Sequence, residues 1–323
     1  MAQPVQKGNY DHIIVKKPSA WVRMKKYAGF YLMFLPVVVV LFIFYYAPMY
    51  GISFAFYNYK PNGKDPKFVG LANFSKLFSD PTFWASFRNT LIISTVNLAL
   101  ATVTSVVVAL LLNEIQKAMV KKVINTVLYL PHFLSWVVVA SIFMLLLQPN
   151  GLLSQILHLF HLIDDTALEQ TDWLTQKSCW RIIFYFINRW KEIGWGTVIY
   201  IAALAGISPD YYEAAEIDGA NRWQQTLNIT LPSISNTILV VFILNLAKVM
   251  NIFESVFVLY NSAVYSVADV IGTYTYRVGL KPTVGLPNYG YSTTIGIFKS
   301  IVSLILVMIT DNISKKVRGY GLV

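Results

Sequence analysis

The chain has 323 residues, of which 56% are hydrophobic and only 13% are charged, with a mean hydropathy of +0.53. Soluble domains carry about 25% charged residues, so this composition excludes an ordinary soluble domain and indicates an integral membrane protein. The net charge of +10 comes from basic residues near the ends of apolar runs, so we expect a lipid membrane around the chain and no nucleic-acid partner. Cys179 is the single cysteine, which excludes an internal disulfide and a cysteine-based metal cage.

The first predicted elements are a polar N-terminal tail and an apolar run. Residues 1–27 lack the apolar core of a signal peptide. The run over 28–50 is long enough to cross a bilayer and no small-residue cleavage site follows it, so we expect a retained membrane span. The next loop, 51–89, alternates aromatic and polar residues, which fits either short helices along the interface or a simple connecting loop.

Five further apolar runs reach the length of about 20 residues that a membrane-crossing helix needs. They cover residues 90–113, 123–147, 182–206, 232–260 and 291–311, and Pro36, Pro131 and Pro232 lie in or at the start of spans, where they would kink or begin a helix. The sequence therefore predicts an all-α integral membrane protein with six transmembrane helices. The transmembrane domain would cover 28–311, followed by a tail over 312–323.

Basic residues predict the orientation, because cytoplasmic loops are enriched in Lys and Arg. The N-terminal tail holds Lys7, Lys16, Lys17, Arg23, Lys25 and Lys26, and the 114–122 loop and the C-terminal tail are basic too. The 51–89 loop is also basic and departs from this rule. Since six spans place both termini on one side, we expect both in the cytoplasm.

The segment 207–231, between the fourth and fifth predicted spans, is polar. Its five charged residues are Asp210, Glu213, Glu216, Asp218 and Arg222. Placing five charges at the bilayer centre would cost on the order of 12–17 kcal/mol. We therefore expect this segment in the cytoplasm.

A short helix is predicted within this segment, over about 208–221. Ser208 would cap its N-terminus, Pro209 would occupy the first helical position, and Gly219 would end it. A helix of about three turns is marginal alone and must contact something. It would either dock on a partner protein or rest on lipid headgroups, and its acidic character favours docking.

This segment resembles the EAA loop of the permease subunits of bacterial ABC importers. That family's pattern is EAA, three residues, glycine, nine residues and I-x-L-P. In this chain the EAA triplet occupies 213–215, the glycine is Gly219, and I-T-L-P occupies 229–232. Stretches at 128–140, 190–220, 269–280 and 296–316 are similar to the carbohydrate-uptake branch, and to a subgroup that handles complex or acidic oligosaccharides such as alginate- or pectin-derived chains.

The resemblance implies a type I ABC importer permease in a bacterial cytoplasmic membrane, with a coupling helix that inserts into a groove on an ATPase subunit. The residues expected in that contact are Glu213, Ala214, Ala215, Asp218, Gly219 and Ala220. The implied partners are a second related permease, two cytoplasmic ATPase subunits, an extracytoplasmic solute-binding protein and an oligosaccharide. A homodimer remains an alternative to the pair of different permeases.

A candidate substrate path is predicted from polar residues in the spans, since such residues normally face a bundle interior or a watery cavity. The candidates are Asn245, Lys248, Asn251 and Ser255, which share an arc of about 120° at 100° per residue, with Glu254 at its edge and Trp195 on the fourth span. Interhelical hydrogen bonding is the alternative. For Arg189, Lys191 and Glu192 we favour that structural role.

The path hypothesis gives Lys248 a selective role: if it faces the path, it would favour sugars that carry carboxylates. Permeation by neutral oligosaccharides remains the alternative.

Motifs for catalysis are absent from the sequence. It has no G-x-x-x-x-G-K-[ST] and no G-x-S-x-G, so we expect a transport subunit that is not an enzyme, holds no cofactor and relies on partner subunits to bind ATP and Mg²⁺. His158 and His161 could serve a metal, but without a third ligand nearby a solvated interfacial pair is the favoured interpretation. An ion-coupled secondary transporter is a further alternative, with Glu254 as its one mid-span carboxylate.

Overall fold

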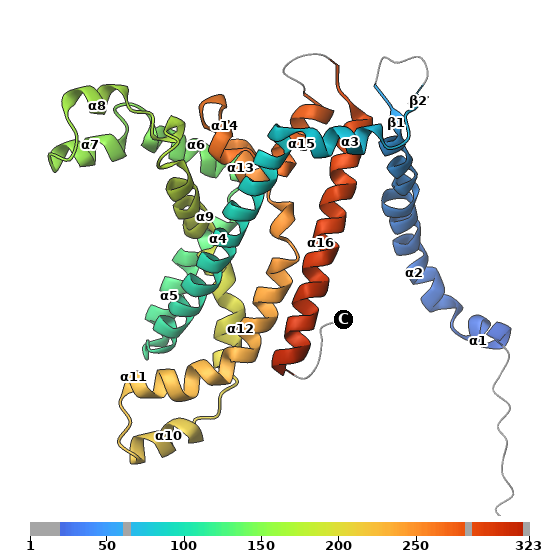
Figure 1. Ribbon diagram of the computed structural model, residues 1–323. Coiled ribbons are helices and arrows are strands. Elements are labelled where there is room, and N and C mark those ends of the chain that lie inside the picture. The colour runs from blue at the N-terminus through green and yellow to red at the C-terminus, as the bar shows by residue number, and fades with distance from the viewer. Residues whose placement is uncertain (1–19, 61–65, 282–285, 319–323) are drawn as a thin grey trace, which may run out of the picture. The chain divides into compact units, whose positions relative to one another are not determined.

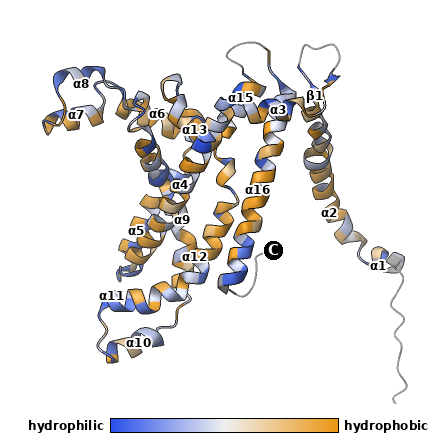
Figure 2. Cartoon of the chain, in the orientation of Figure 1, coloured by the Kyte–Doolittle hydropathy of each residue, from blue (hydrophilic) through white to orange (hydrophobic). Residues whose placement is uncertain are grey.

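The computed structural model describes residues 20–60, 66–281 and 286–318, and the chain divides into two units, 1–52 and 53–323 (Figure 1). In the first unit, α1 (Ala20–Lys26) precedes α2 (Ala28–Leu41), and α2 continues through a π-helical turn, Phe42–Tyr46. No residue of α2 is buried, and apolar residues cover it along its length (Figure 2).

The second unit begins with a 3₁₀ segment, Ala47–Phe56, that crosses the unit boundary, and a two-stranded antiparallel hairpin. The strands are β1 (Tyr57–Asn58) and β2 (Lys67–Phe68), with Tyr57 opposite Phe68. The helices that follow are α3 (Ala72–Ser79), α4 (Pro81–Asn113), α5 (Ala118–Tyr129), α6 (Trp136–Leu147), α7 (Leu152–Leu159), α8 (Asp165–Gln170), α9 (Trp180–Leu204), α10 (Asp210–Ile217), α11 (Arg222–Gln225), α12 (Leu231–Leu246), α13 (Glu254–Leu259), α14 (Tyr265–Ala268), α15 (Ile271–Gly279) and α16 (Tyr289–Arg318).

Helix α4 begins nine residues before the predicted start of the second span, at Pro81 rather than residue 90. Asp80 sets this boundary, because its carboxylate accepts the backbone N–H groups of Thr82 and Phe83 and Pro81 occupies the first turn. With α3 just before it, the 51–89 loop does contain short helical structure, and its placement along a membrane interface stays a prediction.

Two predicted spans are not continuous helices. The expected span 123–147 is interrupted between α5 and α6, where Pro131 lies in a 3₁₀ turn and the Ser135 hydroxyl caps α6 by accepting the Val138 N–H. Pro131 lacks an N–H donor, which explains the break. The expected span 232–260 ends with α12 at Leu246.

The second interruption has a packing cause. After α12 the chain enters a 3₁₀ turn, Val249–Asn251, and then an extended residue, Ile252. This change of direction buries Val249 and Met250, and Met250 joins a cluster with Leu77 and residues of α4, α15 and α16. No proline or glycine marks the break, so the apolar run concealed it.

Within the described residues, five helical segments are long and apolar enough to cross a membrane. They are Ala28–Phe56, Pro81–Asn113, Trp136–Leu159, Arg222–Leu246 and Tyr289–Lys316. Helix α9 matches the expected fourth span in length, but Arg189, Lys191 and Glu192 keep it outside this set. The count of six spans therefore stays a prediction.

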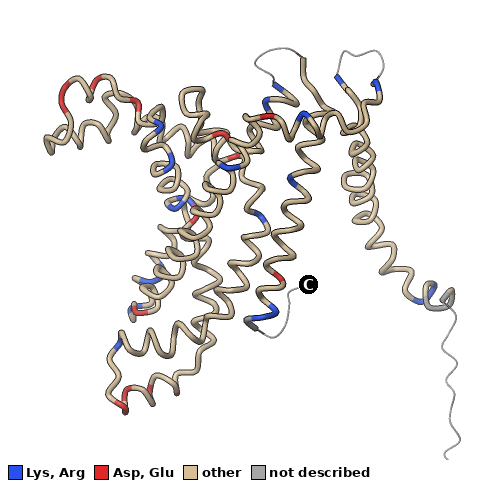
Figure 3. The backbone as a smooth tube through the Cα atoms, in the orientation of Figure 1, with Lys and Arg blue, Asp and Glu red and all other residues tan. Residues whose placement is uncertain are grey.

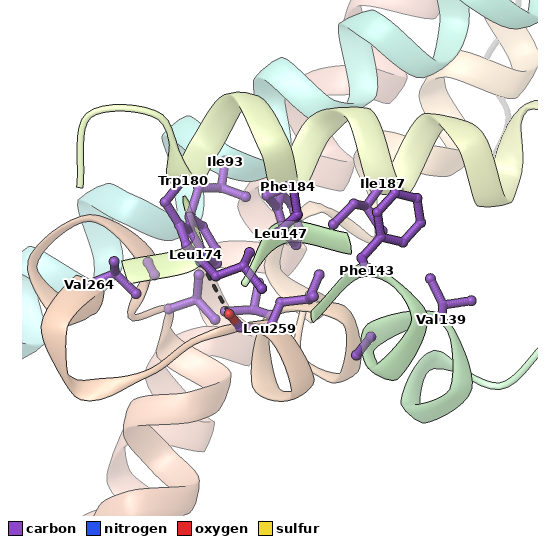
Figure 4. Packing of buried hydrophobic residues seen from close by; sticks show 14 residues of the cluster. Ile93, Val139, Phe143, Leu147, Leu174, Trp180, Phe184, Ile187, Leu259 and Val264 are labelled. Atoms are coloured by element: carbon purple, nitrogen blue, oxygen red, sulfur yellow. Dashed lines mark hydrogen bonds between the residues drawn. The ribbon is translucent and has the colours of Figure 1, made fainter. Parts of the chain in front are cut away.

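The largest buried cluster lies where α9 meets α6, α13 and the turns around them (Figure 4). Trp180 is fully buried there, stacks on Phe184, and donates its indole N–H to the Leu259 carbonyl at 3.2 Å. Further along α9, Gly194 lies so close to α5 that a Cβ would come within 2.1 Å of the Leu128 carbonyl oxygen. Contacts between these helices fix one wall of the cavity described next.

Candidate functional site

A cavity of about 610 Å³ lies between α4, α9, α12 and the 249–251 turn. This volume is within the range of about 300–1,000 Å³ that is usual for small-ligand sites. Its wall is formed by Ser94, Asn97, Leu98, Ala101, Thr102, Ser105, Arg189, Glu192, Trp195, Gly196, Tyr200, Val241, Asn245, Lys248, Val249, Asn251 and Ile252. Hydroxyls, amides, aromatic rings and both signs of charge are therefore available to a polar ligand.

Four of the six predicted path residues are on this wall: Asn245, Lys248, Asn251 and Trp195. The predicted geometry was wrong, because α12 ends before Lys248 and no continuous helical arc exists. Glu254 and Ser255 belong to α13 and are not among the residues that form the wall; Ser255 is buried and Glu254 is exposed in the first turn of α13.

Sequence reasoning missed the contribution of α4. Ser94, Asn97, Thr102 and Ser105 line the cavity, and they recur on α4 at helical spacing together with the small residue Ala101. That polar and small stripe was a usable signal, since polar residues within a span normally face the bundle interior.

The carboxylate of the cavity wall, Glu192, is held by its neighbours. It lies 3.2 Å from the Lys191 ammonium and 2.8 Å from His132 Nδ1. Lys191 also donates to the His132 carbonyl at 2.8 Å. His132 stacks on Trp195 with ring centroids 4.7 Å apart and planes 3° apart. These contacts join α9 to the turn between α5 and α6.

The predicted docking helix corresponds to α10, which is about two turns long and so shorter than expected. Its N-terminus differs by a residue or two from the prediction: the helix begins at Asp210, Pro209 stands in the cap position, and Ser208 Oγ accepts the Asp210 N–H at 3.3 Å. Asp210 and Glu213 occupy the first turn, where the helix dipole favours acids.

Gly219 ends the helix as predicted. Its φ of +78° lies in the left-handed region, which L-residues with a side chain rarely adopt. The Gly219 N–H donates to Glu216 and the Ala220 N–H donates to Ala215, a pair of bonds that forms a Schellman motif. The chain then reverses into α11, which Asn221 and Gln224 cap reciprocally.

The surface of α10 is exposed and acidic (Figure 3). Ile217 is 87% exposed, and Glu216 approaches Arg222 no closer than 3.8 Å. One anchor holds the helix inward, since the Tyr212 hydroxyl bonds Thr230 Oγ1 at 2.9 Å. Of the predicted contact residues, Glu213, Ala214, Asp218 and Gly219 are exposed, and Ala215 and Ala220 are half-buried.

At the opposite end of the helices of this unit, around α15, the structure brings together a polar cluster that the sequence did not reveal. Asp269 is buried and accepts two hydrogen bonds from the Arg277 guanidinium, at 2.9 and 2.7 Å. Ser86 of α4 and Thr273 of α15 donate to the same carboxylate at 3.0 and 2.7 Å. The cluster therefore ties α4 to α15.

A second carboxylate, Asp80, reinforces the same end. Its Oδ2 accepts the hydroxyls of Tyr274 and Tyr291, the latter at 2.9 Å. Burial alone would raise the pKa of Asp80, but hydrogen bonds from these hydroxyls and from backbone amides outweigh it, so the pKa lies below its ordinary value of 3.8. Burial and the bond to Asp80 raise the pKa of Tyr274 above its usual range.

The predicted histidine pair lies at the end of α7 and in the turn that follows it. His158 Nε2 lies 2.8 Å from Asp165, and His161 has a φ of +57°. Within the described residues no group of three or more His, Cys, Asp or Glu side chains could hold a metal ion.

Comparison with known proteins identifies the class of molecule that carries this cavity and this exposed helix. The family described as "Binding-protein-dependent transport system inner membrane component" matches residues 101–319. The polygalacturonan/rhamnogalacturonan transport system permease protein YteP of Bacillus subtilis (strain 168) is 37% identical over 319 residues, 97% of this chain and 96% of YteP. Protein LplB of the same organism is 38% identical over 311 residues, 95% of each chain.

Solved structures agree with these relatives. The crystal structure of a bacterial ABC transporter involved in the import of the acidic polysaccharide alginate contains a chain with a TM-score of 0.83 and 34% identity, covering 92% of this chain and 99% of that chain. The chain therefore belongs to the family of binding-protein-dependent transport system inner membrane components. The resemblance to ABC importer permeases of the carbohydrate branch is confirmed, as is the all-α membrane fold.

Proposed function

We propose that this chain is one permease subunit of an ATP-driven importer that moves oligosaccharides bearing carboxylates across a bacterial cytoplasmic membrane. Alternating access of the cavity between α4, α9 and α12 would carry the sugar inward. Both termini and α10 would lie in the cytoplasm. The partners would be a second related permease, two ATPase subunits that bind ATP and Mg²⁺, and an extracytoplasmic solute-binding protein.

The observation that carries the coupling part of this proposal is the geometry of α10. The helix is short, exposed and acidic, and the Schellman motif at Gly219 fixes its C-terminal end. A helix of two turns is marginal alone, so a partner groove would supply the contacts that the chain itself does not. Glu213 and Asp218 would face basic groups there, while Ala215 and Gly219 would allow close approach.

The substrate class is supported by relatives and by the cavity. The relative YteP is named for polygalacturonan and rhamnogalacturonan, and a related transporter was crystallised with a periplasmic protein bound to an alginate pentasaccharide. These polymers carry carboxylates. The wall of the cavity in this chain carries Lys248, whose side chain is exposed to the open space.

Co-purification with the ATPase subunit tests the coupling role. Gly219→Asp should abolish co-purification, because it adds a side chain and a negative charge where the partner would approach the backbone closely. Gly70→Asp is the matched control, since Gly70 also has a positive φ (+55°) but lies in the turn before α3. Retention of the ATPase by Gly219→Asp would contradict the proposed docking site.

Uptake into proteoliposomes tests the energy source. The assembled importer should take up oligogalacturonate when ATP is enclosed and should show no uptake without ATP. Uptake driven by an ion gradient in the absence of ATP would overturn the importer proposal and favour a secondary transporter.

A further inference from the structure

One cation on the cavity wall, Arg189 in the middle of α9, has fewer partners than its chemistry allows. Its Nη2 donates to Asn97 Oδ1 at 3.1 Å. Its Nε is enclosed and has no hydrogen-bond acceptor within the described part of the chain. A guanidinium has five N–H donors, so the bond to Asn97 satisfies a small part of this capacity.

The acidic residue nearest to Arg189 along α9 forms its ion pairs with other residues. Glu192 is engaged by Lys191 at 3.2 Å and by His132 at 2.8 Å. Among the residues that the structure describes, neither Arg189 nor Lys248 has an ion-pair partner within 4 Å. With Glu192 offset by Lys191, the charge that remains on the wall is positive.

Two neutral groups of the same wall are also unsatisfied. The hydroxyls of Ser94 and Tyr200 are enclosed and lack a hydrogen-bond partner in the described residues, and both residues line the cavity with Arg189. Most buried polar side-chain atoms in proteins have a partner, so three such atoms around one cavity form an exception that calls for an explanation. These atoms are enclosed, so a ligand would bond them only if the wall shifted; what they show is unused polar capacity in the wall beside Arg189.

We infer that Arg189 and Lys248 together bind the carboxylate of a uronate unit while the oligosaccharide passes through this cavity. The inference rests on the proposed function. It assigns the preference for carboxylate-bearing oligosaccharides to a site formed by these two cations. The planar guanidinium of Arg189 matches a carboxylate with two parallel hydrogen bonds, whereas Lys248 contributes a compact charge. Asn97 is a positioning residue, because its amide oxygen holds Arg189 in place from α4.

The wall around the two cations suits a sugar ring. Trp195 is 57% exposed, and His132 covers one face of its indole, so the opposite face remains for the apolar face of a pyranose. Asn245 and Asn251 add amide donors and acceptors for hydroxyls. On this inference Arg189 would contact substrate in addition to the structural bond that it makes to Asn97.

Equilibrium binding to the assembled transporter, without its solute-binding protein, tests the site. The probes are trigalacturonate and its full methyl ester, which has nearly the same shape and no charge. Arg189→Gln should weaken trigalacturonate binding about tenfold, as expected for loss of a charged bidentate contact, and should leave ester binding within about twofold. Arg189→Lys should fall between wild type and Arg189→Gln, because it keeps the charge and loses the fork.

Two comparisons make the result decisive. Arg88→Gln removes the same charge from an exposed position of α4 and should bind both probes as wild type does. Ester binding by Arg189→Gln shows that the variant is folded, and Lys248→Met should again weaken the acid selectively. The inference would be overturned if Arg189→Gln weakened binding of the acid and the ester equally, or left binding of the acid unchanged. In either case uptake by the wild type would still support the proposed function. Failure of the wild type to take up either compound would instead overturn the proposed function.

Discussion

Asp269 and Glu216 are both carboxylates close to an arginine, yet they lie in opposite environments. Asp269, at the α15 end, is 4% exposed and accepts two hydrogen bonds from Arg277 at 2.9 and 2.7 Å. Glu216, on α10, has a side chain that is 58% exposed and lies 3.8 Å from Arg222. The first carboxylate is fully engaged within the chain, and the second remains open to other partners.

This difference shows how one chain can use the same residue types for two purposes. A buried, fully bonded ion pair fixes the arrangement of the helices around it, because either partner alone would be an uncompensated charge. An exposed pair contributes little to stability and can exchange partners at low cost. The α15 end is therefore held together by contacts within the chain, whereas the α10 segment keeps its charges exposed.

Removal of the Asp269 charge should cause the largest loss of stability among the changes considered for these two regions. Asp269→Asn leaves the half-buried Arg277, whose side chain is 16% exposed, without its counter-charge and should lower the free energy of unfolding by about 3–5 kcal/mol. Thermal unfolding of the purified permease in detergent measures the change. Asp165→Asn is the control, because Asp165 pairs with His158 at a side chain that is 91% exposed. Equal losses in the two variants would refute the distinction.

Loss of the tyrosine hydroxyls at Asp80 should have an intermediate effect. Tyr274→Phe removes one bond to a partly buried carboxylate and should cost about 1–3 kcal/mol of stability. Tyr291→Phe should cost a similar amount. Unfolding midpoints measure both changes, and a neutral result for Tyr274→Phe would contradict the proposed tie between α15 and the start of α4.

The lowered pKa of Asp80 predicts that the stability of the fold depends on pH. Because the folded state lowers the pKa of Asp80 below 3.8, its contribution to stability is present above that value and is lost as the pH falls through the lower folded pKa. The double variant Tyr274→Phe/Tyr291→Phe should lose less stability than wild type between about pH 5 and pH 2. Parallel curves for the two proteins would contradict this role.

A smaller and local effect is expected at Gly219. A Cβ there would meet no atom within 4 Å, so only the positive φ opposes Gly219→Ala, which should destabilise the local C-terminal turn of α10 by about 1–2 kcal/mol. Gly219→Asn should cost less, since asparagine tolerates this conformation. Hydrogen exchange of the amides at 215–220 should be faster in the alanine variant, while global unfolding stays nearly unchanged.

The exposed pair on α10 should show the smallest effect. Glu216→Gln should change the free energy of unfolding by no more than about 0.5 kcal/mol, because the pair is long and solvated. A loss comparable to that of Asp269→Asn would show that the α10 segment is tied into the fold as firmly as the α15 end.

The sequence alone predicted the α10 segment best. Its charged residues predicted a position outside the bilayer, and Gly219 predicted the end of the helix. The spacing of the EAA motif predicted the family. Such features are local, since they depend on residues within one or two turns. Four of the six predicted path residues line the cavity, although the helix assumed to present them ends at Leu246, and their role in a substrate path stays a prediction.

The missed features are those that depend on contacts between distant segments. Ser86 and Asp269 are 183 residues apart, and no spacing rule joins them. Likewise, the end of α12 follows from burial of Val249 and Met250 among residues of other helices, not from a local breaker. Tertiary packing decides both, and a single sequence does not display it.

The helical stretch from Arg222 to Leu246 connects the exposed segment to the cavity without a loop. It consists of α11, a π-helical turn over Thr226–Thr230, and α12, and it changes direction between α11 and α12 (Figure 1). Four residues separate one end from α10, and the other end carries Asn245 into the cavity wall, three residues before Lys248. Because backbone hydrogen bonding continues through the bend, a displacement of the Arg222 end would reach the polar cavity along a helix and would not be absorbed by a loop.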